Sequence, residues 1–118
     1  MNDADTTIET LRQAMRVFVA EREWEKYHTP KNLAMSLAIE AAELMEHFQW
    51  LDTDESHAVA ASPDVKAEVA DELADVLCYA LSLANVLQID VSNAVLGKLQ
   101  KNALKYPAER FRGRFRVD

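Results

Sequence analysis

Acidic side chains recur three residues apart in two stretches of this 118-residue chain. The first stretch holds Glu40 and Glu43, and the second holds Glu72 and Asp75. Side chains three residues apart share one side of an α-helix, so each pair would present two carboxylates to a common partner. Between residues 40 and 75 there are 11 acidic residues and a single base, Lys66. Such crowding of like charge destabilises a fold unless a cation neutralises it, so the pattern favours a metal site.

The ligand types narrow the choice of metal. Carboxylate oxygens suit Mg²⁺ or Mn²⁺ better than zinc, and Mg²⁺ in proteins commonly bridges carboxylates to substrate phosphates. Di-iron bundle proteins instead use Glu-x-x-His pairs. His47 follows Glu43 by four residues and is a further candidate ligand, but it has no counterpart in the second stretch.

Three hypotheses follow from the acidic pattern. The first is a magnesium-dependent enzyme that acts on a phosphate ester or anhydride. The second is a helical protein-interaction module whose acidic face is only solvated, and which gains nothing from metal. The third is a carboxylate di-metal redox protein, which would bind iron.

The elements that carry these acids are predicted to be helices. Apolar residues recur at helical spacing from about residue 8 to 22, after a capping box formed by Thr6 and Glu9. Two more helices are predicted at 30–51 and 63–87, each opened by a proline after Thr29 or Ser62. A fourth begins after Asp90 and ends before Pro107, while residues 52–62 are expected to form a loop. The fold class is therefore all-α, a four-helix bundle.

Helical geometry separates the acids from one another. With Leu37 and Leu73 as the centres of the apolar stripes, Glu40 and Glu43 lie at the edge of one stripe, and the pair Glu72 and Asp75 is expected near the border of the other. Glu46 points away from the core and is expected on the surface. The third helix, at about 25 residues or 37 Å, is longer than a compact four-helix monomer requires, which favours an oligomer.

Composition excludes several other classes. The chain has 2 Gly and 3 Pro, too few for a sandwich, a barrel or a Rossmann-type fold. Its only cysteine, Cys78, excludes an internal disulfide and a cysteine-based zinc site, and it is expected to be a small buried hydrophobe. With no apolar run of 18 residues and no signal-peptide pattern, we expect a cytoplasmic protein that has no membrane partner.

The charge distribution is uneven. The formal net charge is −7, yet residues 96–118 carry seven basic and two acidic side chains. The acidic remainder opposes non-specific nucleic-acid binding, so no nucleic-acid partner is expected. We expect one domain over residues 1–118, with a basic C-terminal tail from about residue 111.

Four stretches resemble the MazG-type all-α nucleoside triphosphate pyrophosphohydrolases, most closely the dCTP pyrophosphatase-like subgroup. The likeness runs from about residue 9 to 110. Its motifs are REWEKYHTPKN (22–32), EAAELMEHFQW (40–50), ELADVLCY (72–79) and KLQKNALKYP (98–107).

The resemblance implies hydrolysis of a nucleoside triphosphate, dCTP or a modified dCTP, to the monophosphate and pyrophosphate. It implies Mg²⁺, with Mn²⁺ as a possible substitute, and a homotetramer built as a dimer of dimers, or a homodimer. It implies metal ligands at Glu40, Glu43, Glu72 and Asp75, of which Glu40 or Glu43 would also act as the general base. It implies substrate-binding positions at Trp24, His28, Trp50, Tyr79, Lys98, Asn102, Lys105 and Tyr106.

Overall fold

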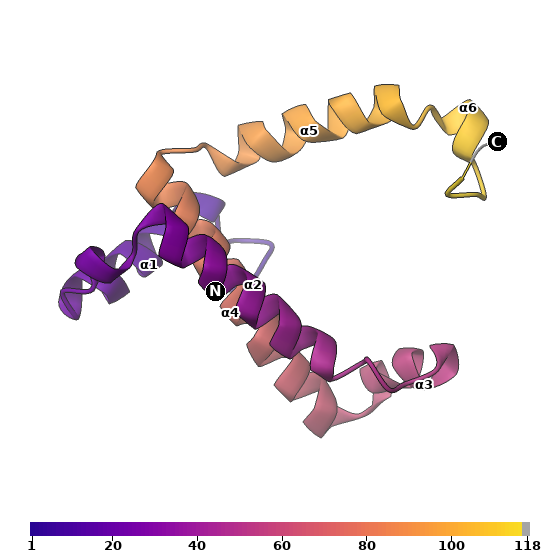
Figure 1. Ribbon diagram of the computed structural model, residues 1–118, viewed down its shortest axis with the longest axis horizontal. Coiled ribbons are helices and arrows are strands. Elements are labelled where there is room, and N and C mark those ends of the chain that lie inside the picture. Colours follow the sequence, from indigo (N-terminus) through magenta and orange to yellow (C-terminus); the bar gives the residue numbers. More distant parts are fainter. Residues whose placement is uncertain (117–118) are drawn as a thin grey trace. The chain divides into compact units, whose positions relative to one another are not determined.

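The structure, a computed structural model that describes residues 1–116, is helical and has no strand in that range (Figure 1). The all-α prediction is therefore confirmed. The elements are α1 (Ile8–Glu21), the 3-10 turn η1 (Glu25–Tyr27), α2 (Pro30–Glu46), α3 (Thr53–Ala58), the 3-10 turn η2 (Val59–Ala61), α4 (Pro63–Leu87), α5 (Val91–Lys105) and α6 (Ala108–Phe111). Contacts divide the chain into one unit over Met1–Gln88 and a second from Ile89 onward.

Capping explains where three of the helices begin. Thr29 Oγ1 accepts the amide of Asn32 at 3.2 Å at the start of α2. Asp90 does the same for Asn93 at 2.9 Å at the start of α5. The α1 cap was misplaced by one residue, because Thr7 rather than Thr6 accepts an amide, that of Thr10, at 3.1 Å.

The segment after α2 differs from the prediction. The helix ends at Glu46 rather than near residue 51, and tight turns follow, with the Phe48 amide bonded to the Met45 carbonyl at 2.9 Å. The expected loop at 52–62 instead contains α3. Its capping box joins the Glu55 amide to Asp52 Oδ1 at 2.8 Å and the Asp52 amide to Glu55 Oε1 at 3.1 Å. This box fixes a new helix start and so favours ending the preceding helix.

Within the first unit, α2 and α1 both pack against α4 (Figure 1). Leu33 of α2 is 1% exposed and is the most deeply buried large side chain among the described residues. The assignment of Leu73 as the centre of the α4 stripe was wrong for packing inside one chain, because Leu73 is 48% exposed. Val69, Glu72 and Val76 are half-buried instead, so the packed face of α4 includes the acid that was expected at its edge.

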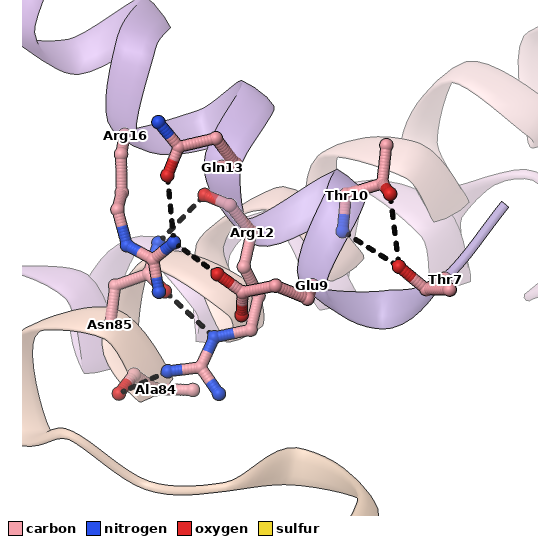
Figure 2. A network of polar contacts seen from close by, with 8 residues as sticks. All are labelled: Thr7, Glu9, Thr10, Arg12, Gln13, Arg16, Ala84 and Asn85. Atoms are coloured by element: carbon pink, nitrogen blue, oxygen red, sulfur yellow. Dashed lines mark hydrogen bonds and ion pairs between the residues drawn. The ribbon is translucent and has the colours of Figure 1, made fainter.

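A polar bridge ties α1 to α4 (Figure 2). Arg12 is 8% exposed, and its Nε donates to Asn85 Oδ1 at 2.8 Å while Asn85 Nδ2 donates back to the Arg12 carbonyl at 3.1 Å. Arg12 Nη2 also donates to the Ala84 carbonyl at 3.3 Å. The α1 stripe was therefore only partly correct, since Val19 is buried whereas Ile8, Leu11 and Phe18 are more than 40% exposed.

The second unit contains α5 and α6. The rings of Tyr106 and Phe111 meet edge to face with their centroids 5.2 Å apart. The predicted basic tail begins where α6 ends, but its last two residues, 117–118, lie outside the described part of the chain. The single domain, the four-helix bundle and the oligomer remain predictions.

Among the described residues, no single helix has both the length and the apolar composition needed to cross a membrane.

Candidate functional site

Three glutamates converge between α2 and α4. Each of Glu40, Glu43 and Glu72 contributes a carboxylate oxygen to a group whose members all lie within 4.8 Å of one another. The spacing in α2 places Glu40 and Glu43 on one side of that helix, and the packed face of α4 supplies Glu72 opposite them. All three side chains are half-buried. The fourth predicted ligand, Asp75, is exposed and stands outside this group.

The convergence raises the proton affinity of the cluster. The pKa of Glu40 rises from its ordinary 4.5 to about 7, first because the carboxyl is partly desolvated and then through a hydrogen bond and charge repulsion from Glu43. The charges of Asp75 and Glu72 add to this rise. Desolvation likewise raises the pKa of Glu72, with help from Glu43 and Asp75 and against the opposing effect of His47.

The donor set fits a hard divalent cation. Glu40 Oε2 and Glu72 Oε2 are buried, and neither has a hydrogen-bond partner within residues 1–116. Buried carboxylate oxygens left unpaired are costly, and Mg²⁺ or Mn²⁺ coordination by oxygen would remove that cost. His47, the further candidate ligand, has its Nδ1 3.9 Å from Glu68 Oε2, which draws it toward a different acid.

An aromatic pocket of about 370 Å³ lies beside the acids, and Asp75 lines it together with Trp24, His28 and Tyr79. The His28 ring has its centroid 6.5 Å from that of Trp24 and 6.4 Å from that of Tyr79, with interplanar angles of 31° and 36°. The structure thus brings together three of the predicted substrate-binding residues. These tilted rings offer aromatic faces on which a planar ligand can stack.

Three lining residues were not predicted as part of this pocket: Met15, Phe18 and Cys78. Cys78 is half-buried at the pocket wall rather than enclosed in the core, and burial together with the charge of Asp75 raises the pKa of its thiol. The only signal in the sequence was its spacing of three positions from Asp75, which places both residues on one side of α4.

The remaining predicted binding residues are placed elsewhere. Trp50 is 86% exposed and lines none of the pockets described here. Lys98, Asn102 and Lys105 follow one another along a single side of α5, in the second unit. Tyr106 caps that helix, with its amide bonded to the Asn102 carbonyl at 2.7 Å and its ring 5.3 Å from Lys105 Nζ. Their part in binding substrate stays a prediction.

Comparison with known proteins gives the class. The model of the MazG-like family matches residues 35–114, and the chain belongs to this family.

Similar proteins can then be named. The chain is 39% identical over 110 residues to "dCTP pyrophosphatase 1" of Bos taurus, an alignment that covers 93% of this chain and 65% of that protein. It is 40% identical over 104 residues to the Homo sapiens protein of the same name, covering 88% and 61%. The chain thus spans less than two thirds of the length of these relatives. A solved structure of a pyrophosphatase from Archaeoglobus fulgidus is 45% identical, with a TM-score of 0.80 and coverage of 91% of this chain and 98% of that one.

Proposed function

We propose that this chain is a divalent-metal-dependent nucleoside triphosphate pyrophosphohydrolase that acts on dCTP or a modified dCTP. The observation that carries the proposal is the order of groups along α4, where Glu72 belongs to the carboxylate cluster, Asp75 stands between, and Tyr79 lines the aromatic pocket. A nucleoside triphosphate has the same order, with charged phosphates at one end and a planar base at the other. The curated relatives are named for hydrolysis of dCTP.

The carboxylates of Glu40, Glu43 and Glu72, with Asp75 beside them, would hold Mg²⁺ or Mn²⁺. At this site such an ion would supply positive charge to neutralise the triphosphate oxygens and would lower the pKa of a coordinated water. Glu40 or Glu43 accepts the proton of the attacking water, because either lies inside the cluster where that water must stand. Bond breakage between the α- and β-phosphates then yields dCMP and pyrophosphate.

The aromatic pocket binds the base in this proposal. Trp24 and Tyr79 supply the ring faces and His28 lines the pocket with them, while Lys98, Asn102, Lys105 and Tyr106 contact the phosphates, as the family resemblance implies. The acting form is a homotetramer or homodimer in the cytoplasm, with no nucleic-acid or membrane partner.

A panel of the four deoxynucleoside and four ribonucleoside triphosphates, assayed with Mg²⁺ for monophosphate and pyrophosphate, tests the activity. We expect dCTP to be hydrolysed best, EDTA to abolish the reaction, and Mn²⁺ to restore part of it. In heavy-oxygen water the label should enter dCMP, because water attacks the α-phosphorus. Release of single phosphates that leaves dCDP would overturn the assignment.

The same preparation tests the competing hypothesis of a non-catalytic acidic face. That hypothesis expects the melting temperature to be the same in Mg²⁺ and in EDTA. The enzyme hypothesis expects Mg²⁺ to raise it, since a ligand that binds only the folded state stabilises that state.

Substitution of the two tryptophans distinguishes a role in base binding from a role in packing. Trp24→Ala should raise KM more than it lowers kcat, because stacking contributes equally to ground-state and transition-state binding. The resemblance predicts the same for Trp50→Ala. Steady-state kinetics with dCTP measure both effects, and an unchanged KM in either variant would assign that tryptophan to packing.

A further inference from the structure

A second pocket, of about 320 Å³, adjoins the aromatic pocket inside the first unit. Met15 and His28 line both pockets, so the two pockets adjoin at these side chains. Ser82 and Asn85 of α4 form one wall of the second pocket, and Arg16 of α1 contributes to the other. Ser82 lies one helical turn beyond Tyr79, which continues the sequence of lining groups along α4.

Two residues that line this second pocket each have a buried polar atom without a hydrogen-bond partner in the described chain, namely Ser82 Oγ and His28 Nδ1. Ser82 is 4% exposed, so water in bulk does not reach its hydroxyl. Native structures pair the great majority of buried side-chain polar atoms, and each exception calls for an explanation. A ligand that enters the pocket is one such explanation.

Two neighbouring polar side chains, those of Asn85 and Arg16, are already hydrogen-bonded, and a third lining residue, Glu25, is exposed. Asn85 is bonded through both its amide oxygen and its amide nitrogen to Arg12, and Arg16 Nη1 donates to Glu9 at 2.8 Å and to Gln13 at 3.0 Å (Figure 2). These bonds hold the walls of the pocket in place. Ser82 and His28 are therefore the buried lining residues that still have a polar atom available to hydrogen-bond a ligand.

We propose that this second pocket receives the hydrogen-bonding edge of the base, and that Ser82 Oγ and His28 Nδ1 are specificity-determining atoms. The inference rests on the proposed function. A hydroxyl both donates and accepts, and a neutral imidazole nitrogen does one or the other, so the pair matches an edge that places a donor beside an acceptor. The 4-amino group and N3 of cytosine form such an edge.

Distance along α4 supports this order. Ten residues separate Glu72 from Ser82, which corresponds to about 15 Å of helix. A ligand that reaches from the carboxylate cluster to Ser82 must be elongated, anionic at one end and polar at the other. The aromatic rings lie between these ends, where the face of a base would stack while its edge continues toward Ser82.

Deoxycytidine and its analogue without the 4-amino group are the probes, with binding measured by NMR titration in metal-free buffer. Ser82→Ala should weaken deoxycytidine binding by about 2- to 13-fold, the effect of losing one neutral hydrogen bond. It should change binding of the analogue much less. Ser92→Ala, the same substitution at an exposed position in α5, is the matched control and should behave as wild type.

The melting temperature and the comparison of the two probes separate the proposed role of Ser82 from a merely structural one. Removing an unpaired buried hydroxyl should leave the melting temperature of the ligand-free chain unchanged or raise it, so weaker binding would not reflect unfolding. The proposal is overturned if Ser82→Ala binds deoxycytidine as wild type does, if it weakens both probes equally, or if deoxycytidine does not bind the wild-type chain at millimolar concentration.

The probes carry no phosphate, which separates this inference from the proposed function. Ser82-dependent deoxycytidine binding without triphosphate hydrolysis would overturn the function and keep the base-edge site. Hydrolysis of dCTP together with Ser82-independent binding would keep the function and overturn the site.

Discussion

Single substitutions test the role of each carboxylate in the cluster. Glu40→Gln, Glu43→Gln and Glu72→Gln should each reduce dCTP hydrolysis by at least ~10²-fold, as expected for loss of a metal ligand or a general base. Asp75→Asn should do the same if this exposed residue completes the metal site. Rates of pyrophosphate release under saturating Mg²⁺ measure all four.

Glu46→Gln is the matched control, because Glu46 lies on the same helix, is exposed, and stands outside the glutamate group. It should retain nearly full activity. The cluster variants should stay folded by circular dichroism, since removing one like charge lowers repulsion. A comparable loss in Glu46→Gln would contradict this assignment of the α2 faces.

The raised pKa of Glu40 also makes stability depend on pH in the metal-free protein. Between 4.5 and about 7 the unfolded chain has lost a proton that folded Glu40 still holds. The contribution of Glu40 to the free energy of unfolding therefore falls as pH rises through this window, and is constant above it.

Urea denaturation in EDTA at several pH values measures this dependence. Glu40→Gln should remove that part of the slope, whereas Glu46→Gln should keep it. An identical slope in wild type and Glu40→Gln would show that the proton affinity of the cluster resides elsewhere.

The spacing of the acids in the sequence identified the residues of the cluster but not the surroundings of each side chain. A separation of three positions places two acids on a shared side of a helix, which is why Glu40 and Glu43 were found. Arg12 and Ser82 were missed, because burial of a polar side chain depends on the neighbours that another helix brings. A serine within an apolar stripe gives no sign in the sequence of whether its hydroxyl finds a partner.

At the scale of elements, α1 is held to α4 through Arg12 as well as through Val19. Arg12→Ala should lower the free energy of unfolding by about 2–3 kcal/mol, because it removes the bonds made by a buried guanidinium and leaves Asn85 Oδ1 without its donor, while the bond from Asn85 Nδ2 to the backbone carbonyl of residue 12 remains. Arg16→Ala removes a surface ion pair with Glu9, whose side chains are 39% and 67% exposed, and should cost less than about 1 kcal/mol.

Urea denaturation of both variants provides the comparison. Both arginines lie in α1 and both lose the same atoms, so they differ in burial and partners alone. Equal losses of stability would show that the Arg12 bridge adds nothing to the docking of α1.

Helix starts were easier to predict than helix ends. Thr29-Pro30 and Asp90 carry local signals that the structure follows. The end of α2 depends on competition from the Asp52 and Glu55 capping box, which was not recognised in a segment rich in polar and small residues. The face of α4 was misjudged for a different reason, since a helix that is apolar on more than one side does not reveal which side its own chain covers.

The whole molecule has a small core for its length. Among the described residues, the buried hydrophobic side chains are Val19, Leu33 and Ala84. Large apolar side chains of α4 and α5 stay about half or more exposed: Leu73, Leu77, Val95, Leu96, Leu99 and Leu104. A domain of this size ordinarily buries far more of its apolar surface, so we expect further copies of the chain to cover these side chains.

Light scattering after size-exclusion chromatography tests this expectation. The wild-type chain should run as a dimer or a tetramer, and Leu77→Glu should give a smaller species with less helical signal. Ser92→Glu, which adds the same charge at an exposed polar position, should leave the mass unchanged. A wild-type monomer at all concentrations would contradict the expectation.

The Arg12 bridge affects how often α1 undocks from α4. Asn85 holds α1 through Arg12 and also forms part of the pocket wall, so a ligand in that pocket meets only molecules in which α1 is docked. Such a ligand slows amide exchange along α1 by drawing the population away from undocked states. The reverse holds with the same factor, because coupling between two equilibria is reciprocal. A substitution at Arg12 that loosens α1 would therefore weaken ligand binding without removing a contact to the ligand. Measurements of affinity alone would then count Arg12 among the binding residues.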